Sequence, residues 1–172
     1  MTEHAPNESV SHLGFVVAIL RRHGVEFIVI GGQAEALMGS PRVTYDTDLC
    51  YRRSQRNLER LAAALKELEP SLRGAPADLP IILDARALAL GSNYTFDTPH
   101  GKLDLLAWVE PIGHYEEVAK HAEVYSFDGG DLLTISLDDL IRVKEHIRRT
   151  KDRGSLIQLL AIKKQREETG RR

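Results

Sequence analysis

The chain has 172 residues, of which 42% are hydrophobic and 28% are charged, and its formal net charge is −2. This length suffices for one well-buried domain but not for two ordinary ones, and the composition excludes wholesale disorder. The small negative charge excludes a general electrostatic attraction to nucleic acid or acidic membranes, so a polyanionic partner would need a local basic patch.

Two groups of basic residues could form such a patch, although the plainer alternative for each is the solvated face of a helix. The first group consists of Arg52, Arg53 and Arg56. The second lies near the C-terminus and consists of Arg148, Arg149, Lys151, Arg153, Lys163, Lys164 and Arg166.

Cys50 is the single cysteine of the chain, which excludes an intrachain disulfide and a multi-cysteine zinc site. It continues an apolar segment, and we expect a small core residue rather than a nucleophile. Residues 1–8 lack the apolar segment of a signal peptide, and no apolar run reaches membrane-spanning length. We therefore expect a soluble cytoplasmic protein with no membrane partner.

Apolar periodicity, capping residues and glycine or proline breaks predict helices alternating with strands. The predicted helices cover residues 9–23, 33–38, 54–69, 83–90, 114–121, 136–149 and 152–167. The predicted strands cover residues 25–30, 42–51, 93–97, 102–108, 123–127 and 132–135, with a hairpin turn at 98–101.

This order of elements predicts an α/β (α+β) fold, in which a short, mixed and twisted sheet is flanked by helices. We expect a flexible tail over residues 1–8, a core domain over 9–136 and C-terminal helices over 137–172 that pack on the core. Residues 71–80 contain proline, glycine and alanine without a period, which predicts a loop. That loop could close over a substrate, or it could be a plain surface connection.

A glycine pair, Gly31-Gly32, follows the apolar run 28–30 and precedes a predicted helix. Glycine lets the backbone come close to an anionic ligand, and the start of a helix directs unpaired N–H groups at it. The junction therefore predicts a turn that holds phosphate.

Acidic residues follow this turn at close range. Asp46 and Asp48 are two residues apart in a segment predicted to be a strand, so both carboxylates should project from one face. Two adjacent oxygen ligands suit Mg²⁺. Asp104 lies between apolar residues in a later predicted strand, where burial without a cation would be costly. We expect it to complete a metal site with the other two aspartates.

The glycine pair and the three aspartates occur in an order and spacing by which the chain resembles the nucleotidyltransferase superfamily of the DNA polymerase β type. The resemblance rests on Ile30-Gly31-Gly32, on Asp46 and Asp48, and on Asp104. Further matches resemble the small bacterial abortive-infection nucleotidyltransferase toxins of type IV toxin–antitoxin systems. These are the run Arg42-Val43-Thr44-Tyr45 before the first aspartate, Lys144, and Lys151-Asp152.

The resemblance implies transfer of a nucleoside monophosphate from a Mg²⁺-bound NTP to an acceptor hydroxyl at a two-metal site. It implies that Gly31 and Gly32 hold phosphates, that Asp46 and Asp48 bind Mg²⁺, and that Asp104 binds a second metal and acts as general base. Its remaining nucleotide contacts would come from Arg42, Thr44, Lys144 and Lys151. Arg42, Lys144 and Lys151 could instead be solvated basic residues without a role in nucleotide binding. Asp152 could be a cap of the last helix.

The acceptor implied by the resemblance could be RNA such as tRNA, a protein, or a small molecule such as an antibiotic. A tRNA acceptor would dock on the C-terminal basic residues, whereas a small molecule would use the 71–80 loop and the region of Trp108. A toxin role would add a cognate antitoxin as partner. The alternative function is a catalytically silent module that binds a nucleotide or partner, but the presence of all three aspartates argues against it.

Overall fold

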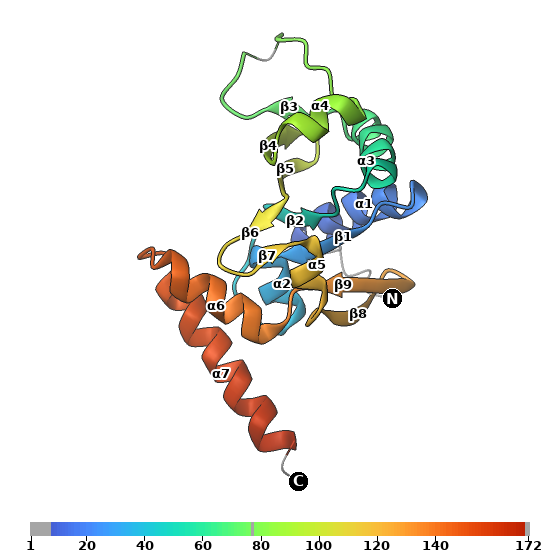
Figure 1. The fold of residues 1–172 in the computed structure, drawn as a ribbon. Coiled ribbons are helices and arrows are strands. Elements are labelled where there is room, and N and C mark those ends of the chain that lie inside the picture. The colour runs from blue at the N-terminus through green and yellow to red at the C-terminus, as the bar shows by residue number, and fades with distance from the viewer. Residues whose placement is uncertain (1–7, 77, 171–172) are drawn as a thin grey trace, which may run out of the picture.

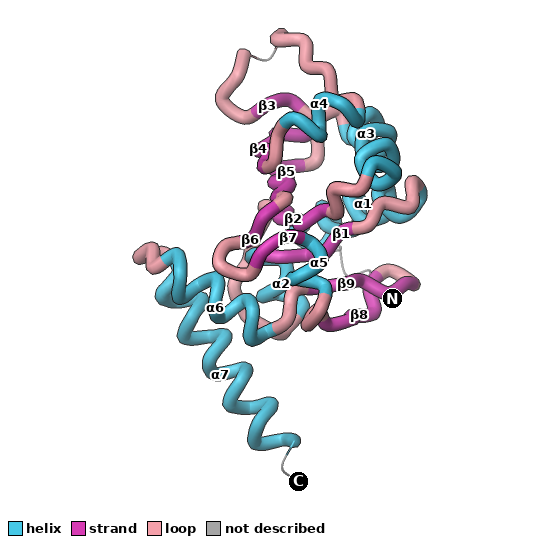
Figure 2. The backbone as a smooth tube through the Cα atoms, viewed as in Figure 1, coloured by secondary structure: helices cyan, strands magenta, loops and turns pink. Residues whose placement is uncertain are grey.

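A computed structural model of the chain describes residues 8–76 and 78–170. The described residues form a seven-stranded mixed sheet, a two-stranded sheet and flanking helices (Figure 1, Figure 2). The helices are α1 (Glu8–Arg22), α2 (Gly31–Leu37), α3 (Gln55–Leu68), α4 (Ala85–Leu90), α5 (Tyr115–Ala119), α6 (Leu137–Ile147) and α7 (Asp152–Gly170). The strands are β1 (Phe27–Ile30), β2 (Thr47–Tyr51), β3 (Ser71–Leu72), β4 (Asn93–Thr98), β5 (Gly101–Leu106), β6 (Trp108–Val109), β7 (Gly113–His114), β8 (Glu123–Phe127) and β9 (Gly130–Thr134).

The large sheet has the strand order β3-β4-β5-β2-β1-β9-β8, with β1 and β2 near its centre. β2 runs antiparallel to β1 and parallel to β5, and β1 runs parallel to β9. The mixed sheet predicted from the sequence is confirmed. The parallel pairing of β2 with β5 places the strand that carries Asp48 beside the strand that carries Asp104.

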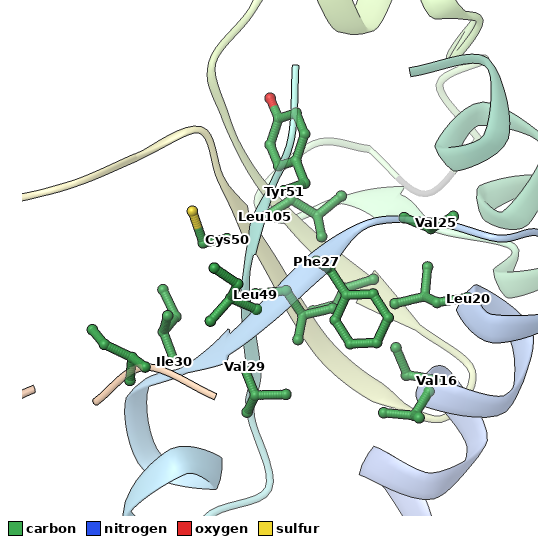
Figure 3. Close-up of a cluster of buried hydrophobic side chains, with 14 of the residues drawn as sticks. Val16, Leu20, Val25, Phe27, Val29, Ile30, Leu49, Cys50, Tyr51 and Leu105 are labelled. Carbon is green, nitrogen blue, oxygen red and sulfur yellow. The ribbon is translucent and has the colours of Figure 1, made fainter. Parts of the chain in front are cut away.

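The core of the molecule lies where α1 covers the central strands (Figure 3). All four residues of β1 are buried, which explains why its sequence is an uninterrupted apolar run. Val16 and Leu20 of α1 point toward Phe27 and Leu49. Cys50 is fully buried in the same core, so the expected structural role of the cysteine is confirmed.

A serine side chain caps the start of each of the two strongly amphipathic helices, α3 and α6. The Ser54 side chain accepts a hydrogen bond from the Asn57 N–H at the start of α3, and Ser136 accepts one from Asp139 at the start of α6. A serine cap satisfies an otherwise unpaired helix N–H group. α6 and α7 lie side by side, and α7 extends beyond the sheet at one end of the molecule (Figure 1).

The structure corrects some predicted boundaries. The predicted strand over residues 42–51 begins only at Thr47, where pairing with β5 begins, so residues 41–46 form a loop. The predicted strand over residues 102–108 ends at Leu106, and Trp108 belongs to the separate strand β6. β3 and β7 were not predicted because each has only two residues, too few for an alternating pattern.

Most of the expected tail, residues 1–7, lies outside the described part of the chain. None of the helices within residues 8–76 and 78–170 is long and apolar enough to cross a membrane.

Candidate active site

The glycine turn, Gly31-Gly32, lies directly against Asp48 of strand β2. Gly31 has a φ of +64°, and a Cβ built on it would lie 2.3 Å from Oδ2 of Asp48. A Cβ on Gly32 would lie 2.9 Å from the Thr44 side chain. Both glycines are therefore needed because the backbone turn, Asp48 and Thr44 approach one another too closely for a side chain. The structure brings these four predicted site residues together.

Asp48 and Asp104 are directly opposite each other in the parallel pairing of β2 and β5. Burial raises the pKa of Asp48 to about 6, and the negative charges of Asp104 and then Asp46 add to this increase. Lys144 opposes the increase only in part. An accumulation of carboxylates that suppresses ionisation is an environment that a cation would relieve.

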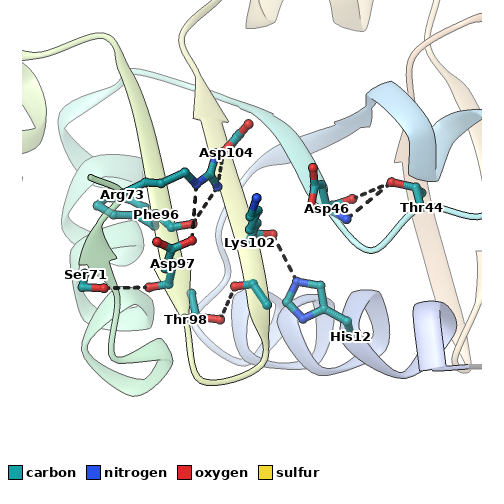
Figure 4. A network of polar contacts seen from close by, with 11 residues as sticks. His12, Thr44, Asp46, Ser71, Arg73, Phe96, Asp97, Thr98, Lys102 and Asp104 are labelled. Atoms are coloured by element: carbon teal, nitrogen blue, oxygen red, sulfur yellow. Dashed lines mark hydrogen bonds and ion pairs between the residues drawn. The ribbon is translucent and has the colours of Figure 1, made fainter. Parts of the chain in front are cut away.

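Asp46 is placed differently from its prediction. It lies in the loop before β2 and is exposed, and its N–H donates a 3.4 Å hydrogen bond to Thr44 Oγ1 (Figure 4). Asp46 and Asp48 therefore do not project from one face of a single strand as predicted, because β2 has no partner strand before Thr47. The charge of Asp46 nevertheless acts on Asp48.

The donor groups fit a magnesium ion that is shared with a nucleotide. Within residues 8–76 and 78–170, no group of three or more His, Cys, Asp or Glu side chains is placed to hold a metal ion. Mg²⁺, however, commonly uses only one or two carboxylates and takes its other ligands from phosphate and water. The crowded Asp48 carboxylate and the neighbouring Asp46 supply such a pair.

Lys144 of α6 forms buried ion pairs with side chains of α2 and α7. Its Nζ is 3.0 Å from Asp152 Oδ1 and 3.2 Å from Glu35 Oε1, and both acidic side chains are at most 6% exposed. Burial opposes ionisation of Asp152, but hydrogen bonds and charge from Lys144 and Arg149 hold its pKa below the usual value. Asp152 is thus an ion-pair partner at the start of α7, and Lys144 is not the solvated residue of the alternative prediction.

Arg42 ties the loop before β2 to helix α7. Its Nη1 donates to Ser155 Oγ and, at 3.4 Å, to the carbonyl oxygen of Lys151. Lys151 itself is exposed. Arg42 and Lys151 therefore lie near the glycine turn, as predicted, although Arg42 is already engaged within the protein.

Two cavities meet at the predicted site. The smaller, of about 220 Å³, is polar and lies among the glycine turn, the loop before β2 and the start of α7, and its walls include both glycines, Arg42, Thr44 and Lys151. The larger, of about 430 Å³, reaches Asp104 and continues to Trp108, Val109 and the apolar face of α6. Gly31, Asp48, Lys144 and Arg149 line both cavities.

A cavity of about 590 Å³ lies elsewhere, between α6, α7 and β8. Its lining includes Lys163 and Arg166 of the C-terminal basic group but none of the residues predicted to bind metal or nucleotide, so its size alone does not make it the active site.

Two residues of the site were missed by the sequence analysis. Arg73, in the 71–80 loop, lies 2.9 Å from Asp104 Oδ1 through its Nη2 (Figure 4). Glu35 is buried against Lys144 on α2. Arg73 lies in an irregular segment without a motif, so nothing in the sequence indicated that it belongs to the site. Glu35 is a charged residue among small residues in α2, which was only a weak indication of a buried ion pair.

No protein-family model matches the chain, and no curated protein matches it. Solved structures do match. The lincosamide antibiotic adenylyltransferase LnuA, with lincomycin bound, has a TM-score of 0.59 and 13% identity, and the match covers 88% of this chain and 96% of that one. ANT(2'')-Ia in complex with adenylyl-2''-tobramycin has a TM-score of 0.58 and 14% identity, with coverages of 90% and 89%.

An antigenic nucleotidyltransferase-like protein from Paracoccidioides brasiliensis also matches, with a TM-score of 0.58 and 17% identity over 92% of this chain and 78% of that one. At these identities the likeness establishes the fold and leaves the activity to be argued from the site. The chain therefore has the fold of the nucleotidyltransferases.

Proposed function

We propose that the protein transfers a nucleoside monophosphate from a Mg²⁺-bound NTP to a hydroxyl group of a small-molecule acceptor. The observation that carries this proposal is the meeting of two cavities at Asp48, one polar beside a glycine turn and one partly apolar beside Asp104. A donor and an acceptor bound in these cavities would meet between the two carboxylates.

The donor would bind in the polar cavity. The backbone N–H groups of Gly31 and Gly32 would hold phosphate oxygens, since the start of α2 has no side-chain cap to compete for them. Arg42, Thr44 and Lys151 line the same cavity and would contact the nucleotide. Asp46 and Asp48 would hold Mg²⁺, which supplies positive charge to the transferring phosphate and the leaving pyrophosphate.

The acceptor would bind in the larger cavity. Its volume of about 430 Å³ lies within the range of about 300–1,000 Å³ that is usual for small-molecule sites. Val109, Ile135 and Leu140 provide apolar walls, while Asp104 lies at the end nearest the donor. Asp104 would accept the proton of the attacking hydroxyl, and alignment of the two substrates would supply much of the rate enhancement.

Small-molecule acceptors also agree with the structural neighbours, two of which were solved with an antibiotic or an adenylylated antibiotic bound. The resemblance to abortive-infection toxins favours RNA instead. Several C-terminal basic residues counted as an RNA-docking surface are engaged in ion pairs, among them Arg149, Lys163 and Arg166. We therefore place small molecules first and keep RNA as an outcome of the test.

The test is incubation of the purified protein with Mg²⁺ and each α-³²P-labelled NTP. The acceptors are panels of lincosamides and aminoglycosides, bacterial RNA and lysate protein. We expect label on a small molecule, lost in Asp46→Asn and Asp104→Asn and kept in Asp131→Asn, which changes an exposed aspartate of β9. Label on RNA would replace the proposed acceptor class. NTP binding without any labelled acceptor would favour the silent binding module.

A further inference from the structure

The position of Arg73 bears on how many metal ions the site accepts. Arg73 follows β3, and its backbone N–H donates a 3.0 Å hydrogen bond to Thr95 O on β4. Its Nη2 donates to Phe96 O at 2.9 Å, and its Nε lies 3.3 Å from Asp97 Oδ1. The guanidinium is therefore tethered to β4 by contacts that do not depend on Asp104 (Figure 4).

From that tether the guanidinium reaches across to β5. Its Nη2 lies 2.9 Å from Asp104 Oδ1, and the two side chains are only 29% and 26% exposed. A charged hydrogen bond between partly buried groups is stronger than one in water. A divalent ion bound to this oxygen would have to displace Arg73 or share the oxygen with a second positive charge.

Arg73 places a positive charge directly on Asp104 before any metal ion binds, although it shares that charge with Asp97. Lys144 contacts Glu35 and Asp152 instead of Asp104. A second divalent ion at Asp104 would therefore lie next to a positive charge that the fold already supplies, and like charges at close range repel.

We propose that Arg73 is the resident second cation of this site, so that the chain takes up one divalent ion, at Asp46 and Asp48, for each nucleotide bound. Arg73 holds the Asp104 carboxylate in place opposite Asp48 and occupies one of its two oxygens, so a second ion at Asp104 would have to bind beside the guanidinium. The inference rests on the proposed nucleotide-binding function and narrows it from a two-metal site to one metal ion and one arginine.

The experiment is equilibrium dialysis of Mn²⁺ with a nonhydrolysable NTP analogue, in which both Mn²⁺ and the analogue bound per chain are counted. We expect one Mn²⁺ per bound analogue for the wild type and two for Arg73→Gln, since removal of the guanidinium frees Asp104. Arg73→Lys should restore the count of one because it restores the charge. Arg53→Gln is the matched control, because Arg53 donates to the carbonyl groups of Ala89 and Gly91 and lies in no ion pair of the described residues.

Two Mn²⁺ per analogue in the wild type would overturn the inference while leaving the nucleotide-binding function intact. The inference also fails if Arg73→Gln binds the analogue with a single Mn²⁺. Failure of the wild type to bind the analogue at all would instead refute the proposed function. If Arg73→Gln does not fold, the wild-type count still decides between one ion and two, and Arg73→Ala then tests the role of the guanidinium in the same way.

Discussion

Asp48 and Asp104 face each other across the parallel pairing of β2 and β5, with the glycine turn packed directly on Asp48. This relationship puts the Asp48 carboxylate where the protein alone does not favour its ionised form, since burial and the neighbouring negative charges raise the pKa of Asp48 to about 6. Sites that perform chemistry often carry such a cost in stability.

The first prediction concerns stability without metal. The folded pKa of Asp48, about 6, exceeds the reference value of 3.8, so the folded state binds more protons than the unfolded state between these values. The stabilising contribution of Asp48 is therefore complete below about pH 4 and is lost as the pH rises through about 6. Asp48→Asn should raise the free energy of unfolding at pH 7.5 by about 1–2 kcal/mol.

Urea denaturation in the presence of a chelator measures this effect. The gain should shrink toward pH 4, whereas Asp131→Asn should show no comparable trend because its side chain is exposed. A destabilised Asp48→Asn protein at pH 7.5 would contradict the assigned cause.

The second prediction concerns magnesium itself. A ligand that binds only the folded state stabilises it by about 2.7 kcal/mol at one hundred times its dissociation constant. Mg²⁺ with a nonhydrolysable NTP should therefore raise the Tm of the wild type in a concentration-dependent way. Asp46→Asn and Asp48→Asn should show a much smaller increase in differential scanning fluorimetry, and an unchanged increase would remove these residues from the metal site.

The third prediction concerns the glycine turn. Gly31→Ala combines a left-handed φ of +64° with a Cβ only 2.3 Å from Asp48 Oδ2. We expect a loss of about 2–4 kcal/mol and at least a hundredfold loss of activity. Gly129→Ala is the matched control, because its φ of +78° imposes similar backbone strain with no atom within 4 Å. It should cost about 1 kcal/mol and leave activity unchanged. Equal losses in the two variants would mean that backbone strain alone matters.

The fourth prediction concerns Lys144. Lys144→Met leaves Asp152 with only Arg149 and leaves Glu35 buried without the cation next to it. Removal of one partner from a buried ion pair typically costs about 3–5 kcal/mol. Lys151→Met, at an exposed position of the same cavity, should change stability by less than about 0.5 kcal/mol. Urea denaturation at pH 7.5 measures both, and a near-neutral Lys144→Met would show that the network contributes little to stability.

The fifth prediction concerns the acceptor cavity. Trp108 lines it, is 44% exposed and packs edge-on against His114 at 4.6 Å between ring centroids. Trp108→Ala should raise the KM for the acceptor about tenfold with little change in the KM for the NTP. Ile157→Ala, at an exposed apolar position of α7 outside this lining, should change neither constant. Equal effects on both substrates would indicate a general structural role for Trp108.

The sequence alone was sufficient for features that depend on neighbours along the chain. The apolar run before Gly31 predicted a buried strand, and Ser54 and Ser136 predicted the starts of two amphipathic helices. These predictions were confirmed because hydrophobic periodicity and capping act over a few residues. The glycine turn and Asp48 also lay together as expected.

The tertiary structure alone decided where Asp46 lies and which basic and acidic side chains pair with Asp104 and Lys144. Asp46 lies outside β2 because a strand ends where its partner strands end, and no local signal marks that point. Arg73 reaches Asp104, and Lys144 reaches Glu35, through contacts between elements far apart in the sequence, whereas Lys144 meets Asp152 across the short connection from α6 to α7. The strength of an ion pair depends on distance and burial in space, and the order of residues along a chain does not contain those quantities.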